Sequence, residues 1–224
     1  MRYERKIERR ITARHRKALQ LCGDVAGKRI LDIGCSMGAF ESLALEGKPA
    51  EAFGIDLDEK DLMLARENVP LAKFKAGSAL ELPFEKNCFD IIVMLDVIEH
   101  LPAGSEAKAL LEINRVLKKG GRLLVSTPNN NLLSNALDPA FLMGHRHYNA
   151  VQLEKMLAES GFAVRRVETA GAFYELLAML LYYPFKNLLR MEIPLKGFFD
   201  RKRDLEYLHK KGFVTLYILA EKQG

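Results

Sequence analysis

Hydrophobic positions along the chain fall into short apolar runs that are separated by longer segments of mixed polarity. Apolar runs rich in branched residues that end at Gly, Asp or Pro are typical of buried strands. The pattern predicts strands near residues 29–33, 52–58, 72–77, 88–97, 122–128, 163–168 and 213–222.

The segments between these runs carry helical spacing and recognisable helix ends. NAVQLEKMLAESG has Asn149 at the expected N-cap, Gln152 three residues later and Gly161 after its end, a combination that favours a helix. Gly120 and Gly121 are expected to stop the helix that begins near Glu106. The predicted helices cover residues 1–22, 40–45, 58–69, 106–118 and 149–161.

Alternation of strands and helices predicts an α/β fold, a Rossmann-like, doubly wound, mostly parallel seven-stranded sheet. The last two strands lack a clear helix between them, so the last strand is expected to be antiparallel. We expect one core domain over residues 23–171 and 212–224. A basic helix at residues 1–22 precedes it, and an insertion at residues 172–211 interrupts it.

Charge is concentrated at one end of the 224-residue chain. Residues 1–17 hold eight Lys or Arg and two Glu, a charge of +6, so the formal net charge of +5 leaves −1 for the remainder. The basic segment fits a solvated helix, or attraction to an anionic substrate, a lipid surface or nucleic acid. The three cysteines show no disulfide or metal spacing, which favours a reducing, cytoplasmic compartment.

The stretch RILDIGCSMGAF, which begins at Arg29, has the order strand, glycine loop, helix that binds nucleotides. Counted from Gly34, the G-x-G-x-x-G pattern of dinucleotide sites has Ser36 and Ala39 in its second and third glycine positions. The presence of Ser36 in place of the second glycine makes a nicotinamide dinucleotide less favoured as the ligand, but does not exclude it. Asp56 closes the second strand, where a carboxylate can accept both hydroxyl groups of a ribose.

Six motifs follow one another in a specific order: LDIGCSMG, GIDLD, GSALELPF, FDIIVMLDVIEHL, LKKGGRLLVSTPN, and HRHYN with the helix after it. Together they resemble class I S-adenosylmethionine-dependent methyltransferases, in the small-molecule branch of ubiquinone and menaquinone biosynthesis. The resemblance runs from Arg29 to about Glu168 and implies S-adenosylmethionine as the cofactor. The implied reaction is methyl transfer to a small or lipid-like acceptor.

The resemblance also implies roles for particular residues. Asp32 is expected at the methionine end of the cofactor, Asp56 at the ribose and Leu57 against the adenine. Ser78 stands where the family commonly has Asp, and Asp96 is expected to line the pocket below the methionine. The expected cofactor-binding set is Asp32, Gly34, Cys35, Ser36, Gly38, Asp56, Leu57, Gly77, Ser78, Ala79, Leu95 and Asp96.

Candidate proton acceptors follow the fifth strand. His145, His147 and Tyr148 lie where this family often presents residues to the acceptor, whereas His100 is usually structural there. The alternate spacing of the two histidines could also suit a metal. No Cys or acid pattern accompanies them in the sequence, so we expect no metal site.

The insertion is the best sequence clue to the acceptor. Its segment 176–185 has no charge, and Arg201, Lys202, Arg203, Lys210 and Lys211 follow. The segment is too short to span a membrane. It could form a lid over an apolar acceptor, a contact between two copies in a homodimer, or a peripheral membrane attachment.

Other functions remain open at this point. An RNA methyltransferase would explain the basic N-terminus, yet MLDVIEHLP lacks the Asn/Asp-Pro-Pro-aromatic motif of amino-group DNA methyltransferases. Nucleic acid is therefore not the expected partner. A non-catalytic S-adenosylmethionine-binding protein and a nicotinamide oxidoreductase are the remaining alternatives.

Overall fold

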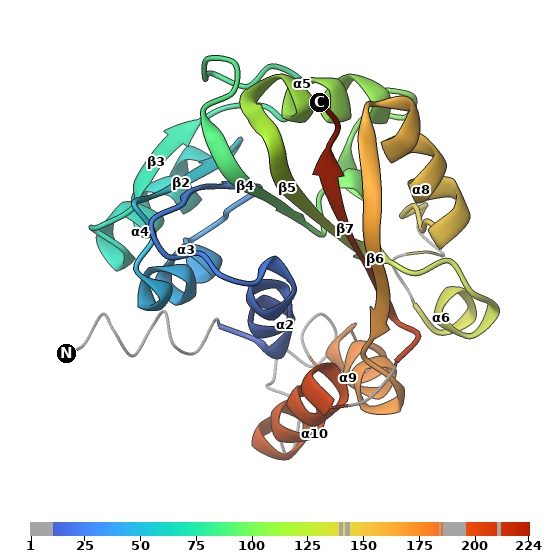
Figure 1. Cartoon of the computed structure of the whole chain (residues 1–224). Coiled ribbons are helices and arrows are strands. Elements are labelled where there is room, and N and C mark those ends of the chain that lie inside the picture. Colours follow the sequence, from blue (N-terminus) through green and yellow to red (C-terminus); the bar gives the residue numbers. More distant parts are fainter. Residues whose placement is uncertain (1–10, 139–140, 142–143, 184, 186–195, 210–211) are drawn as a thin grey trace.

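One mixed sheet forms the centre of the protein (Figure 1). The computed structural model describes residues 11–138, 141, 144–183, 185, 196–209 and 212–224. Its sheet has seven strands in the order β3-β2-β1-β4-β5-β7-β6. The strands are β1 (Arg29–Ile33), β2 (Glu51–Asp56), β3 (Lys73–Ala76), β4 (Phe89–Leu95), β5 (Leu117–Pro128), β6 (Phe162–Ala170) and β7 (Thr215–Lys222).

The pairing of the strands confirms the predicted fold class. Strands β1 to β5 pair in parallel, and β7 lies between β5 and β6 and is antiparallel to both. Thr215 at the start of β7 pairs with Pro128 and Ala170, the last residues of β5 and β6. The carboxyl ends of the parallel strands and the start of β7 therefore share one edge of the sheet.

Helices cover both faces of the sheet. The α-helices are α2 (Ala13–Cys22), α3 (Ala39–Ala44), α4 (Glu59–Asn68), α5 (Glu106–Val116), α6 (Leu132–Leu137), α8 (Ala150–Glu159), α9 (Phe173–Tyr183) and α10 (Lys196–His209), and the 3₁₀ helices are η1 (Leu45–Gly47) and η2 (Ile98–His100). Helix α8 has the predicted capping box, with reciprocal bonds between Asn149 and Gln152. The first ten residues of the predicted basic helix lie outside the described residues.

One local prediction is corrected, and one helix was missed. The helix that begins at Glu106 ends at Val116 and not at the glycines, because Leu117 is extended and pairs with Phe89. The fully buried side chain of Leu117 stabilises that pairing. Helix α6 was not predicted at all, although Asn131 caps it by accepting a bond from the Ser134 N–H at 2.9 Å.

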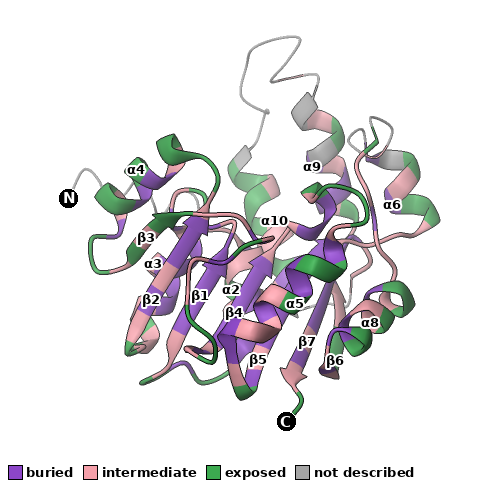
Figure 2. Ribbon diagram, turned by 90° about the horizontal axis from the view of Figure 1, so that it is seen from above, coloured by how far each residue is buried: buried purple, intermediate pink, exposed green. Residues whose placement is uncertain are grey.

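The continuous apolar run of β4 is explained by burial on both sides (Figure 2). Ile92 and Met94 face a core that includes α5 and α8, and Ile91 and Val93 face a second core that includes α2 and α3. A strand covered on both faces has no solvent side, so it needs no alternation of polar residues.

The segment at residues 172–211 contributes α9 and α10, which pack against each other. Helix α10 also packs against α2. Glu206 of α10 accepts bonds from the backbone N–H groups of Ala172, Tyr174 and Glu175, at 3.0–3.1 Å. A carboxylate at a helix start satisfies donors that otherwise lack partners. Among the described residues, no helix has the length and apolar character needed to cross a bilayer.

Neighbouring leucines of α5 test the core. Leu110 is fully buried and Leu111 is 57% exposed. We expect Leu110→Ala to lower the free energy of unfolding by about 2–5 kcal/mol, because it removes buried methyl groups and leaves a cavity. Leu111→Ala is the matched control and should change it by less than about 0.5 kcal/mol. Urea denaturation measures both, and equal losses would contradict the assigned orientation of α5.

Candidate active site

The glycine loop between β1 and α3 adopts left-handed backbone conformations at three positions. Gly34 and Gly38 have φ of 81° and 83°, and Ser36 has φ of 45°. A Cβ on Gly34 would clash with Val97, so only glycine allows the loop to approach that residue. Ser36 adopts a conformation that glycine takes more easily, which matches the position where the resembling family often has glycine.

Asp56 fixes this loop from the end of β2. Its Oδ2 accepts the backbone N–H of Ser36 at 2.8 Å, and its Oδ1 accepts that of Asp58 at 3.0 Å. The N–H groups of Gly34 and Cys35 donate to the Ile55 carbonyl at 2.8 and 3.0 Å. The end of β2 and the glycine loop therefore form one rigid unit.

Two acids lie buried behind the loop. Asp32 is 4% exposed and Glu41 of α3 is 1% exposed. No described residue bonds to Oδ1 of Asp32 or to either carboxylate oxygen of Glu41. Burial, followed by the nearby charge of Asp56, raises the pKa of Asp32 to about 8, and burial also raises the pKa of Glu41. The sequence analysis missed Glu41, because the charge of a lone residue in a short helix gives no sign of burial.

The other predicted cofactor residues surround the same loop. The Leu57 side chain is 79% exposed and follows Asp56 directly. Gly77 donates its N–H to the Asp56 carbonyl at 3.0 Å. The Ser78 hydroxyl accepts the Leu80 N–H at 3.1 Å, as an ordinary turn residue does. Ala79 is buried.

Cys35 and Leu95 pack rather than present reactive groups. Burial raises the pKa of the Cys35 thiol, so the side chain stays protonated and unreactive. Leu95, at the end of β4, packs against the core on the α2 side of the sheet.

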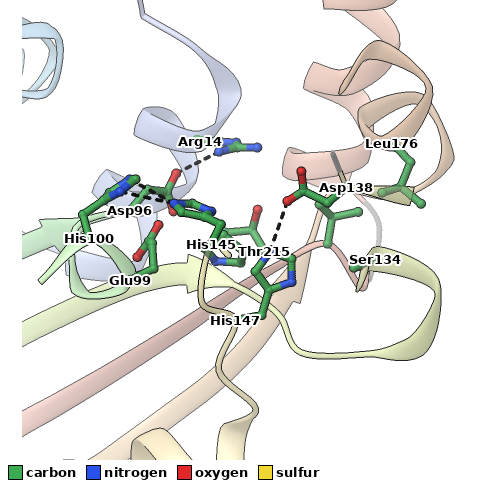
Figure 3. Close-up of a pocket in the computed structure, with 12 residues that line it drawn as sticks. Arg14, Asp96, Glu99, His100, Ser134, Asp138, His145, His147, Leu176 and Thr215 are labelled. Carbon is green, nitrogen blue, oxygen red and sulfur yellow. Dashed lines mark hydrogen bonds and ion pairs between the residues drawn. The ribbon is translucent and has the colours of Figure 1, made fainter. Parts of the chain in front are cut away.

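A cavity of about 230 Å³ opens at the carboxyl edge of the sheet (Figure 3). Its walls come from α2, the end of β4, η2, α6, the segment before α8, α9 and β7. The lining residues are Arg14, Asp96, Glu99, His100, Pro128, Ser134, Asp138, His145, His147, Leu176, Val214 and Thr215.

Asp96 links this cavity to the glycine loop, because it directly precedes Val97, the residue that approaches Gly34. Asp96 has φ of 54° and accepts a bond from the Ser126 hydroxyl at 2.9 Å. Its Oδ2 also accepts a bond from Nη1 of Arg14 at 2.8 Å. The sequence analysis did not single out Arg14 within the basic N-terminal segment.

His147 is buried in the cavity wall with both ring nitrogens beside oxygen atoms. Nδ1 lies 2.8 Å from Oδ1 of Asn135, and Nε2 lies 3.1 Å from Oδ2 of Asp138. Asn135 donates its own Nδ2 to Asn130, so its Oδ1 is an acceptor. Both neighbours of the ring are therefore oxygen acceptors, and together they fix the orientation of the His147 ring.

His145 points toward η2, where its Nε2 lies 3.2 Å from Nδ1 of His100 (Figure 3). Burial, followed by the neighbouring His100, lowers the pKa of His145. Glu99 and Asp138 also lie beside these histidines. Glu99 directly precedes His100 but lies 46 positions before His145, so sequence spacing alone did not associate these groups.

Tyr148 does not reach the cavity lining. Its hydroxyl donates to Oε1 of Glu106 at 2.9 Å, and burial, with that bond, raises its pKa. Its backbone instead pairs with the end of β5, through bonds of 3.2 Å to Pro128 and 2.9 Å to Asn130. This pairing places the two preceding histidines at the cavity.

Comparison with known proteins agrees with this geometry. Residues 31–125 match the family described as "Methyltransferase domain". A "Probable S-adenosylmethionine-dependent methyltransferase" of Mycolicibacterium smegmatis is 34% identical over 150 residues, which are 66% of this chain and 56% of that protein. A "Ubiquinone biosynthesis O-methyltransferase" of Bordetella bronchiseptica is 34% identical over 118 residues, 50% of this chain and 47% of that protein. The chain thus spans about half the length of these relatives.

A solved structure shows the same fold. The methyltransferase in a complex with the Haloferax volcanii Trm112 methyltransferase activator superimposes with a TM-score of 0.70 at 18% identity. The match covers 99% of this chain and 94% of the other.

The buried Asp32 predicts a dependence of stability on pH. Its pKa in the folded protein is raised to about 8, so between pH 4 and 8 the folded protein retains a proton that the unfolded chain has released. The free energy of unfolding should therefore fall as pH rises, by up to about 1.4 kcal/mol per unit from this group.

Asp32→Asn should remove the contribution of Asp32 to the decrease in the free energy of unfolding with rising pH. The exposed Glu46 provides the control substitution, since Glu46→Gln should leave the profile unchanged. Denaturation across this pH range measures the effect. An Asp32→Asn profile parallel to the wild type would show that Asp32 is ionised in the folded protein.

Proposed function

Because residues 31–125 form a methyltransferase domain of the S-adenosylmethionine-dependent class, we propose that the protein methylates a small or lipid-like acceptor. The strongest support is that the glycine loop and the histidine cavity lie next to each other. The glycine loop approaches Val97, and the adjacent Asp96 lines the histidine cavity. A cofactor on the loop and an acceptor in the cavity would then be neighbours, as direct group transfer requires.

The residues at the loop fit S-adenosylmethionine. The unpartnered Oδ1 of Asp32 suits the ammonium group of the methionine end. The two oxygens of Asp56 accept the backbone N–H groups of Ser36 and Asp58, and a carboxylate oxygen can accept a further bond from a ribose hydroxyl. The exposed Leu57 offers an apolar surface to the adenine. The bound cofactor supplies a methyl group that is activated by its attachment to a sulfonium.

The cavity suits an acceptor that is partly apolar. Pro128, Leu176 and Val214 line it beside the histidines. The relative named for ubiquinone biosynthesis supports an acceptor of this kind.

The insertion acts in this proposal as a lid. Leu176 of α9 lines the cavity, and Glu175 beside it binds both Arg14 and Arg203. Arg203 is thereby neutralised inside the protein rather than presented to anionic headgroups. These contacts favour a lid over a membrane attachment or a dimer contact. The predicted basic residues Lys210 and Lys211 lie outside the described residues.

His147 is the residue to which we assign proton uptake from the acceptor. Asn135 and Asp138 fix the orientation of its ring, and the Asp138 carboxylate stabilises the imidazolium that protonation produces. The lowered pKa of His145 keeps that neighbouring ring neutral near pH 7. Tyr148 has no place in this assignment, because Glu106 holds its hydroxyl.

Two cations in the described part of the basic segment are engaged within the protein. Arg14 binds Asp96 and Glu175, and Lys17 forms an ion pair with Glu168 at 2.5 Å. These cations stabilise the packing of α2 and are not displayed for phosphate groups.

Replacement of Asp56 tests the cofactor site. Asp56→Asn should weaken binding of S-adenosylhomocysteine by at least about tenfold, because a hydrogen bond to a charged group contributes about 1.5–3 kcal/mol. Titration calorimetry measures the affinity. Glu59→Gln, a change at an exposed acid of the following helix, is the control. Unchanged affinity in Asp56→Asn would remove Asp56 from the site.

The reaction itself is tested with methyl-labelled S-adenosylmethionine and fractions of an extract of the source cell. We expect label in the lipid or small-molecule fraction. His147→Ala should slow the transfer by about 10²–10⁴-fold while the affinity for S-adenosylhomocysteine stays unchanged. Label in nucleic acid would contradict the proposed acceptor class. Cofactor binding with no label in any fraction would favour a non-catalytic binding protein.

A further inference from the structure

The cavity wall contains a group of metal-ligating atoms that the proposed methyl transfer does not use. Glu99 and His100 belong to η2, and His145 lies in the segment before α8. One ligand atom from each of the three lies within 4.8 Å of the others. Figure 3 shows these side chains converging from two separate segments on one side of the cavity.

Glu99 has one carboxylate oxygen that lacks a hydrogen-bond partner among the described residues. The residue is 4% exposed, and its Oε2 accepts the Thr127 hydroxyl at 3.0 Å. Its Oε1 is buried and receives no hydrogen bond from the described residues. A buried carboxylate oxygen without a donor is costly, because it has lost water and gained nothing in return. The nearby anion Asp96 adds to that cost, and the charge of Arg14 offsets part of it.

The two histidines present nitrogen atoms to each other. Nε2 of His145 lies 3.2 Å from Nδ1 and 3.3 Å from Nε2 of His100. One N–H···N bond could satisfy part of this arrangement, but it would leave Oε1 of Glu99 without a partner. A cation bound by both rings and the carboxylate would satisfy all three groups.

The surrounding structure holds these ligands in place without a metal. Arg146, the residue after His145, donates to the carbonyls of Ile98 and Glu99 at 3.3 Å. It also forms an ion pair with Glu106 at the start of α5. The two segments that carry the ligands are therefore connected, which lowers the cost of ordering a site on binding.

We propose that Glu99, His100 and His145 bind one divalent transition-metal ion such as Zn²⁺ or Mn²⁺. Two imidazoles and one carboxylate favour these ions over Mg²⁺ and Ca²⁺, which prefer oxygen ligands. Three protein ligands leave coordination positions for a further oxygen ligand.

A second triad, Asp138, His145 and His147, shares His145 with this one. The Asp138 and His147 side chains already lie 3.1 Å apart, and Asn135 lies 2.8 Å from the other ring nitrogen, so His147 has partners within the protein. Glu99 has no such solution among the described residues. The metal is therefore assigned to the Glu99 side of the cavity.

The position of the ion also narrows the acceptor class, an extension that rests on the proposed function. A bound hydroxyl group of the acceptor would coordinate the ion through its oxygen and lose its proton more readily. The proton would pass to the His147–Asp138 pair or to water. This favours an alcohol, phenol or vicinal diol, and therefore O-methylation.

Metal binding is tested with Zn²⁺ alone, without cofactor or acceptor, on full-length protein freed of metal by a chelator. Titration calorimetry should give one site, and Co²⁺ should give the visible absorption of a nitrogen- and oxygen-ligated ion. His100→Ala and Glu99→Gln should each weaken Zn²⁺ binding by at least about 10–100-fold. Because His100 is exposed, its replacement should leave the fold intact, which circular dichroism checks.

Asp138→Asn is the matched control and should retain the Zn²⁺ affinity. Wild-type affinity no higher than that of His100→Ala would overturn the proposal. Loss of binding in Asp138→Asn with retention in Glu99→Gln would overturn it too, by assigning the ion to the other triad. Label transfer that persists in chelator-treated protein would contradict only the role of the ion in O-methylation, since Zn²⁺ binding is measured without the reaction.

Discussion

The guanidinium of Arg14 joins parts of the chain that are far apart in sequence. It bonds to Asp96 at the end of β4, to Glu175 of α9, and to the Tyr207 hydroxyl of α10 at 2.9 Å. The Arg14 side chain is only 29% exposed, so these acids must compensate the loss of its water. Such a network adds little net stability. Its bonds instead restrict α2, the insertion and Asp96 to one relative arrangement. The shape of the cavity depends on that arrangement.

The strand order explains why the cofactor loop and the cavity are adjacent. The chain leaves β1 toward β2 and β3 on one side, and β4 and β5 lie on the other. In open α/β sheets, ligands bind where the strand order reverses, beyond the carboxyl ends of the strands. Here that point lies between Gly34 after β1 and Asp96 after β4. Val97, which follows Asp96, approaches Gly34 at this point, and Asp96 itself lines the cavity with His145, His147 and Leu176.

Much of the fold could be predicted from sequence because its signals are local. The apolar runs of β1 and β4, and the cap at Asn149, depend on residues close together in the chain. The glycine loop and Asp56 could be identified for the same reason. Sequence reasoning could not identify the partners of Arg14, the burial of Glu41 or the approach of Glu99 to His145, because each depends on contacts between distant segments. The end of α5 was misplaced for a similar reason, since pairing of Leu117 with Phe89 decided it.

In the proposed function, the glycine loop and the histidine cavity form one continuous active site. The most direct measurement is a crystal structure of the protein with S-adenosylhomocysteine. We expect the ribose at Asp56, the adenine against Leu57, and the sulfur atom directed past Asp96 into the cavity that His147 lines. A nucleoside bound away from this loop, or a sulfur atom directed away from the cavity, would contradict it.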